Sequence, residues 1–89
     1  MKSGKKIPSR NFILFMKENQ NQFHRLGIVV SKEVGPANYR NRIKRLFREF
    51  FRLHKNQIMG SYDFVIRVKK GCSLRAYAET EEEMRKLSL

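Results

Sequence analysis

Apolar residues gather in two short runs near the beginning of the chain, separated by polar residues. The first run is 12–16, Phe-Ile-Leu-Phe-Met, and the second is 26–30, Leu-Gly-Ile-Val-Val. Short runs with this aromatic and β-branched content favour strands. Because the polar segment 17–22 follows the first run as a turn or loop, we expect two neighbouring strands joined as a hairpin with a long loop. Gly35-Pro36 then breaks the pattern.

Between Ala37 and His54 the apolar period becomes that of a helix. Positions i, i+3, i+4, i+7 and i+8 from residue 43 are all apolar, and Tyr39 extends this face by one turn. Such spacing predicts an amphipathic helix that packs on the sheet. The residues of the face are Ile43, Leu46, Phe47, Phe50 and Phe51.

The rest of the chain predicts one more strand and one more helix. Segment 63–68 alternates, which places Phe64, Ile66 and Val68 on one side of a strand. Segment 76–87 is expected to be helical, with Glu79 and its acidic neighbours in the half where the helix dipole favours acids. The order β-β-α-β-α predicts a single α+β domain over residues 1–89. Its expected form is a small two-layer sandwich with one β-sheet and helices packed on it.

Charge adds information about partners. The 89 residues include 20 Lys and Arg against 8 Asp and Glu, a formal net charge of +12. Residues 1–78 carry +14 and residues 79–89 carry −2, so the body of the domain is the basic part. An imbalance of this size favours a polyanionic partner.

A single cysteine, Cys72, forms no internal disulfide and is interpreted as a small residue near a turn. No apolar run is long enough for a signal peptide or a membrane span, so we expect a cytoplasmic protein.

The predicted central helix carries most of the informative charge. Between Arg40 and Lys55 there are seven basic residues and one acid, Glu49. At 100° per residue, the side opposite the apolar face is polar and basic. It consists of Asn41, Arg45, Arg48, Arg52 and Lys55, with Arg40, Arg42 and Lys44 flanking the apolar face.

Like charges three and four residues apart destabilise a helix. A helix that keeps them favours phosphate contacts, for which the arginine guanidinium is well shaped. The alternative is a solvated helix face. An amphipathic basic helix could also bind DNA, an acidic protein or an anionic membrane. We expect no membrane partner, because Phe47, Phe50 and Phe51 are needed to cover the sheet.

The order of residues is more specific than the charge. The run 25–32, Arg-Leu-Gly-Ile-Val-Val-Ser-Lys, is followed by Val34-Gly35, by 40–45, Arg-Asn-Arg-Ile-Lys-Arg, and by Arg48-Glu49. This arrangement closely resembles the signature of the bacterial ribonuclease P protein family. Segment 63–66, with Lys69 soon after, is similar to the following strand of that family. The resemblance extends from about residue 4 to the C-terminus.

The resemblance implies a left-handed β-α-β crossover and two RNA-binding surfaces. One is an arginine-rich motif that faces the catalytic RNA and the nearby substrate. The other is a sheet face that binds the 5′ leader of precursor tRNA. Phe15 matches an aromatic residue of that face, and its alternative role is that of a core residue, which is what we expect of Phe12 and Phe64. The expected RNA-binding residues are Arg40, Asn41, Arg42, Lys44, Arg45, Arg48, Arg52 and Lys32.

The chain also departs from the family. Family members usually begin with a helix that carries two phenylalanines and forms one wall of the leader cleft. Here only a few residues precede Phe12, so that helix is expected to be missing: either the sequence is shortened or the protein lacks the wall. Glu33 stands where a second lysine is common, and Pro36 and Asn38 replace the more usual residues at the start of the helix.

The sequence predicts no catalytic or metal-binding residues. His24 and His54 have no partners at metal-ligand spacing, and His54 is expected to be a partly buried residue of the helix. There is no glycine-rich phosphate loop. The resemblance implies that Mg²⁺ is held by the partner RNA, ribonuclease P RNA, and that the protein supports RNA- and Mg²⁺-dependent endonucleolytic removal of the leader from precursor tRNA. A general RNA-binding module without a cleavage role is the alternative.

Overall fold

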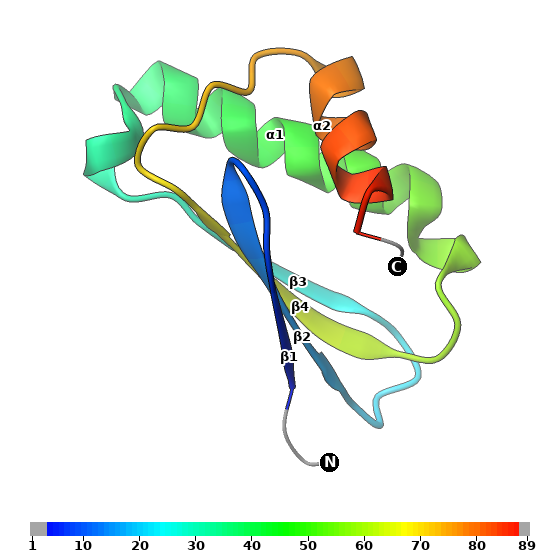
Figure 1. Ribbon diagram of the computed structural model, residues 1–89. Coiled ribbons are helices and arrows are strands. Elements are labelled where there is room, and N and C mark those ends of the chain that lie inside the picture. Colours follow the sequence, from blue (N-terminus) through cyan, green and yellow to red (C-terminus); the bar gives the residue numbers. More distant parts are fainter. Residues whose placement is uncertain (1–3, 88–89) are drawn as a thin grey trace.

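Four strands form one sheet, and two helices cover one face of it (Figure 1). The computed structural model describes residues 4–87. The predicted two-layer α+β sandwich is confirmed. Its elements are β1 (Lys5–Pro8), β2 (Phe12–Glu18), β3 (Arg25–Val29), α1 (Ala37–His54), β4 (Tyr62–Val68) and α2 (Tyr77–Arg85), with single 3-10 turns η1 (Lys32–Val34) and η2 (Lys55–Gln57) before and after α1.

The predicted hairpin of the first two apolar runs is wrong. The strand order is β1-β2-β4-β3, so β4 lies between the two strands that were expected to be neighbours. β4 is antiparallel to β2 and parallel to β3. The link 19–24 therefore crosses the end of β4, a span of about 10 Å for two strand spacings, which six residues reach easily. A long polar loop can join two strands that are neighbours or two strands with another between them. Here β4 pairs with both β2 and β3 and separates them.

The first strand, β1, is not predicted by the hydrophobic pattern. Its four residues, Lys5–Pro8, contain one non-proline apolar side chain, Ile7. β1 pairs antiparallel with β2 at the edge of the sheet, where Lys6 lies opposite Phe15. Proline is tolerated at such an edge because one side of the strand needs no ladder hydrogen bonds. The observed order is therefore β-β-β-α-β-α.

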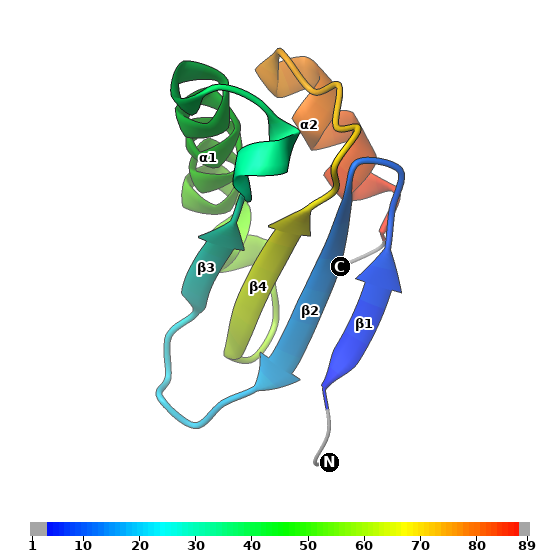
Figure 2. The same ribbon diagram turned by 90° about the vertical axis from the view of Figure 1, so that its left-hand side faces the viewer.

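The connection from β3 through α1 to β4 is the left-handed crossover that the family resemblance implied. In Figure 2 the sheet lies in front, the helices lie behind it, and β3 and β4 both run upward. The chain leaves β3 on the left, passes behind the sheet as α1 and returns as β4 on the right. Most β-α-β crossovers have the opposite hand. Here the crossover brings α1 to the same face as α2.

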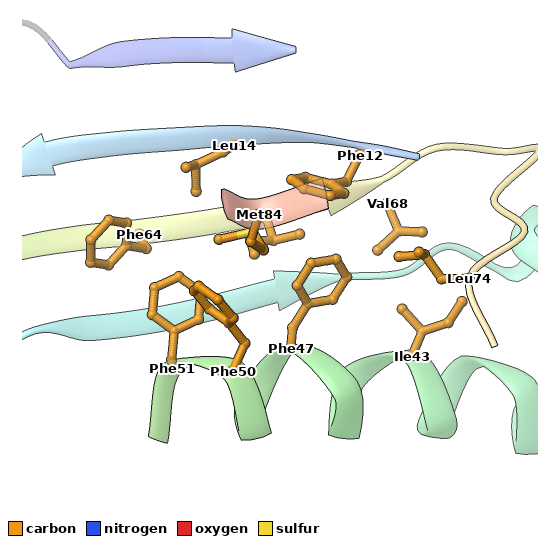
Figure 3. Close-up of a cluster of buried hydrophobic side chains, with 11 residues drawn as sticks. Phe12, Leu14, Ile43, Phe47, Phe50, Phe51, Phe64, Val68, Leu74 and Met84 are labelled. Carbon is orange, nitrogen blue, oxygen red and sulfur yellow. The ribbon is translucent and has the colours of Figure 1, made fainter. Parts of the chain in front are cut away.

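The core fills the space between the sheet and the helices (Figure 3). The helix face predicted from the sequence supplies four buried residues, and the alternating segment of β4 supplies three. The expectation that Phe12 and Phe64 are core residues is confirmed, with 0% and 1% exposure. Phe12 meets Phe47 edge to face at 5.0 Å between ring centroids. The buried apolar residues are Phe12, Leu14, Ile43, Phe47, Phe50, Phe51, Phe64, Ile66, Val68, Leu74 and Met84.

A carboxylate of α2 fastens this helix to the turn between β1 and β2. Glu83 accepts hydrogen bonds from the Ser9 hydroxyl and, at 2.8 Å each, from the backbone N–H and the side-chain amide of Asn11. Asn11 is buried, and its side-chain oxygen accepts a bond from the Ser73 N–H at 2.9 Å. Burial tends to raise the pKa of Glu83, but the hydrogen bonds from Ser9 and Asn11 outweigh it and lower that pKa. This cluster holds α2 and the segment before it against the sheet.

Candidate nucleic-acid interface

The helix α1 separates an apolar face from a basic one. Ile43, Phe47, Phe50 and Phe51 are buried against the sheet. Of the predicted RNA-binding residues on α1, five are exposed and two are half-buried. The exposed ones are Asn41, Arg42, Arg45, Arg48 and Arg52, and the half-buried ones are Arg40 and Lys44. The amphipathic period of the sequence therefore places cationic groups in water over the length of α1.

Two of these arginines are engaged within the protein. Arg52 forms a two-point ion pair with Glu49, with nitrogen–oxygen distances of 2.6 and 3.1 Å. The hydrogen bond from Arg52 lowers the pKa of the Glu49 carboxyl. Arg40 donates from Nε to the Gly35 carbonyl oxygen at 3.0 Å, which ties the beginning of α1 to the preceding turn. Both side chains are therefore partly occupied before any partner arrives.

The remaining basic residues of the predicted set are available. Within residues 4–87, no ion pair involves Arg42, Lys44, Arg45 or Arg48. Lys32 lies exposed on η1, close to the beginning of α1 in the chain. These five side chains form a basic surface with free guanidinium and ammonium groups, which is the kind of surface that attracts phosphates.

The second candidate surface is the sheet face that carries no helix, seen toward the viewer in Figure 2. Phe15 points to this face, because its neighbours Leu14 and Met16 in β2 pack against the core. The alternative interpretation of Phe15 as a core residue is wrong, since it is half-buried on the side away from the helices. Opposite Phe15 in β4 is Val65, which is 39% exposed.

The open sheet face combines apolar and cationic side chains. Val29, 52% exposed, stands in register with Arg67, whose side chain is also exposed. At the other end, Arg25 pairs with Asp63 at 2.9 Å, and this hydrogen bond lowers the pKa of the Asp63 carboxyl. The sequence reasoning did not assign Val65 or Arg67 to this surface. The alternation of β4 contained the signal, because residues between buried positions point to the other face.

The side chains of His54 and Cys72 are partly buried by packing within the protein. The imidazole of His54 stacks on Phe50 at 4.3 Å between centroids, and its Nδ1 lies 3.0 Å from the Phe50 carbonyl oxygen. This confirms the expectation of a partly buried histidine. Burial raises the pKa of the Cys72 thiol. Among residues 4–87, no group of three or more His, Cys, Asp or Glu side chains lies close enough to hold a metal ion.

In the same part of the chain, no helix is both long enough and apolar enough to cross a bilayer. The fold and its surfaces define a small, strongly basic α+β protein with a cationic helix and an exposed sheet face. The model of the Ribonuclease P family matches residues 1–89. The chain belongs to the ribonuclease P protein family, and the resemblance of its central motif is confirmed.

Relatives and solved structures agree with this assignment. The ribonuclease P protein component of Syntrophus aciditrophicus is 44% identical over 81 residues, covering 91% of this chain and 68% of the relative. That of Desulfosudis oleivorans is 44% identical over 85 residues, covering 96% and 70%. The RNase P protein of Thermotoga maritima superposes with a TM-score of 0.85 at 32% identity, covering 97% of this chain and 84% of the other. The Staphylococcus aureus RNase P protein gives 0.83 at 29% identity, covering 96% and 78%. Membership in this family implies an RNA partner.

Proposed function

We propose that this chain is a protein subunit of ribonuclease P that binds the catalytic ribonuclease P RNA and the 5′ leader of precursor tRNA. Through these contacts it promotes endonucleolytic removal of the leader. The observation that carries the proposal is that, within residues 4–87, the exposed Arg42, Arg45 and Arg48 of α1 take part in no ion pair, in a chain of the ribonuclease P protein family. The proposal also places the protein in the cytoplasm, in keeping with a single cysteine and no disulfide framework.

The basic surface of α1 would contact RNA phosphates. Arg42, Arg45 and Arg48 offer planar guanidinium groups that bind phosphate oxygens at two points. Asn41 adds a side chain that both donates and accepts hydrogen bonds. Arg52 would contribute less than the sequence suggested, because Glu49 already neutralises it at 2.6 Å. Neutralisation of the basic side chains by RNA phosphates would also relieve the repulsion among like charges on the helix, which favours the complex.

The open sheet face would bind the single-stranded leader. Phe15 presents an aromatic ring on which a base can stack whatever its identity. Val65 and Val29 extend the apolar surface beside it, and Arg67 provides a cation for the leader backbone. A sheet that carries an aromatic ring and flanking cations is suited to a leader of variable sequence.

The chemistry is proposed to reside in the RNA. Mg²⁺ ions held by that RNA would activate the attacking water and stabilise the leaving oxygen during hydrolysis of the phosphodiester bond. The protein's own residues would screen the repulsion between the two RNAs and hold the leader. Its presence would therefore reduce the Mg²⁺ concentration that cleavage requires.

The direct test is cleavage of a precursor tRNA by a bacterial ribonuclease P RNA at low Mg²⁺, with and without this chain. Stimulation supports the proposal. The variant carrying Arg45→Ala and Arg48→Ala should lose most of the stimulation. Its RNA affinity should also depend less on salt, by about 0.9 in the log–log slope for each lost phosphate contact. Arg85→Ala with Lys86→Ala removes the same two charges from exposed positions at the end of α2 and is the charge-matched control, which should leave both unchanged.

The competing function is that of a general RNA-binding module with no role in cleavage. The same charge and the same helix would serve it. Tight RNA binding without any stimulation of cleavage would favour this alternative and refute the subunit proposal. Stimulation that the double arginine variant retains in full would place the RNA contact elsewhere on the protein.

A further inference from the structure

At the edge of the basic surface of α1, the structure contains a hollow between the beginning of α1 and the segment that precedes α2. Arg42 and Arg45 of α1 line one side of it, and Arg75 lines the other. Asn38 and Tyr39, in the first turn of α1, also line it. Arg75 is 30 residues from Arg45 in the sequence, and only the fold brings the two together.

The backbone around Arg75 is fixed from two directions. The Tyr39 hydroxyl donates to the Leu74 carbonyl oxygen at 2.8 Å, and the Cys72 carbonyl lies 3.1 Å away. One carboxylate oxygen of Glu79 accepts from the N–H groups of Arg75 and Ala76 at 2.7 and 3.1 Å. The segment is thereby tied to α1 on one side and to α2 on the other. Because the backbone is already held, binding would need to order only the Arg75 side chain and not the segment that carries it.

The charged side chains that line the hollow are all cationic, and the nearby Glu79 carboxylate is directed to the backbone N–H groups of Arg75 and Ala76. Three arginines line it and no acidic side chain does. Among residues 4–87, none of these three arginines takes part in an ion pair. The first turn of α1 contains no acid, and its N-cap, Pro36, makes no side-chain capping bond, so the positive end of the helix dipole adds to the field. Guanidinium groups converging on one concave site are the recurrent arrangement for binding a phosphate.

We infer that this hollow binds a backbone phosphate of the RNA partner, and that Arg75 is a phosphate-binding residue together with Arg42 and Arg45. The inference rests on the proposed function and extends it beyond the basic helix. An RNA strand lying over the first half of α1 contacts the segment before α2 as well, so the bound RNA spans two elements that the sequence keeps apart.

The test measures binding of the full chain to ribonuclease P RNA over a range of salt concentrations. Arg75→Ala should weaken binding and reduce the log–log salt slope by about 0.9, as expected for one lost phosphate contact. Arg75→Lys keeps the charge and should recover most of the slope. Arg85→Ala alone serves as the control, because it removes one positive charge from an exposed site outside this hollow.

The Arg75 side chain is exposed and makes no hydrogen bond within residues 4–87, so Arg75→Ala should leave the thermal unfolding temperature unchanged. A salt slope for Arg75→Ala equal to that of Arg85→Ala would overturn the inference. If the unaltered protein still stimulates cleavage at low Mg²⁺ in that case, only the role of the hollow fails and the proposed function stands. If the unaltered protein fails to stimulate, the proposed function fails independently of Arg75.

Discussion

The hydrogen bonds that attach α2 to the turn between β1 and β2 are expected to stabilise the fold, and a substitution that replaces one oxygen by nitrogen tests this. In Glu83→Gln, one carboxylate oxygen becomes an amide NH₂ group of nearly the same shape. All three partners of Glu83 are donors: the Ser9 hydroxyl, the Asn11 N–H and the Asn11 side-chain amide. The new amide must therefore direct a donor toward a donor at one of these contacts.

The expected loss of stability follows from these contacts. Hydrogen bonds to a charged group contribute about 1.5–3 kcal/mol each, and a buried donor left without a partner costs about 1–3 kcal/mol. Because Glu83 itself is only half-buried, we take the lower part of the range and expect a loss of about 2 kcal/mol. For a domain of this size, that corresponds to a decrease of roughly 10 °C in the unfolding temperature.

The pH dependence adds a second readout. The pKa of Glu83 is lower in the folded protein than in the unfolded chain, so its stabilisation is complete above the unfolded pKa. It is lost as the pH falls through the lower, folded pKa, where the carboxylate becomes protonated. The difference between the unaltered protein and Glu83→Gln should therefore shrink below about pH 4.

Thermal unfolding followed by circular dichroism measures both effects. Glu82→Gln is the matched control: its side chain is one position away and 73% exposed, and its one ion pair within residues 4–87 is with Lys86 at 3.8 Å. That control should change the unfolding temperature by a degree or two at most, about the size expected for exposed ion pairs. Equal effects of Glu83→Gln and Glu82→Gln at pH 7 would show that the hydrogen bonds to Ser9 and Asn11 do not stabilise the fold.

Two further predictions concern RNA binding. Phe15→Ala should weaken binding of a precursor tRNA with a single-stranded leader by about 1–3 kcal/mol, the contribution of one base stacked on an aromatic ring. Its affinity for mature tRNA, which has no leader, should stay the same. Equal losses of affinity for both RNAs would show that Phe15 does not contact the leader. Glu33→Lys should tighten RNA binding and steepen the salt slope by about 0.9, because it replaces an exposed acid next to Lys32 with a cation. An unchanged slope in a salt titration would show that η1 does not approach the RNA.

The helices were the most predictable part of the fold. The apolar stripe of α1 repeats over several turns, so the expected bounds Ala37–His54 agree with those of the helix. The predicted helix over residues 76–87 corresponds to α2 at Tyr77–Arg85, where only the frayed ends differ. The strand β4 was equally clear, because buried and exposed residues alternate along it.

Strand pairing could not be predicted from local pattern. The position of β4 between β2 and β3 depends on contacts between residues more than 30 positions apart, such as Leu26 with Phe64. β1 has almost no apolar signal of its own and is stabilised by pairing with β2. For the candidate interface, the sequence indicated the basic residues of α1 but not that Arg75 joins Arg42 and Arg45. The pairing of Arg52 with Glu49 was readable from their i,i+3 spacing, which brings side chains together on a helix.

The crossover explains how so small a chain can carry both a core and two exposed surfaces. By bringing α1 to the same side as α2, it covers one sheet face with both helices and leaves the other without a helix (Figure 2). The apolar stripe of α1 packs on the sheet, whereas the exposed basic side chains Arg42, Arg45 and Arg48 lie outside the core and contribute little to its packing. Loss of Arg45 or Arg48 should therefore change RNA binding without loss of the fold, whereas loss of Phe47 or Phe50 should disturb both. This separation is what makes the basic surface, the open sheet face and the Arg75 hollow individually testable in one domain.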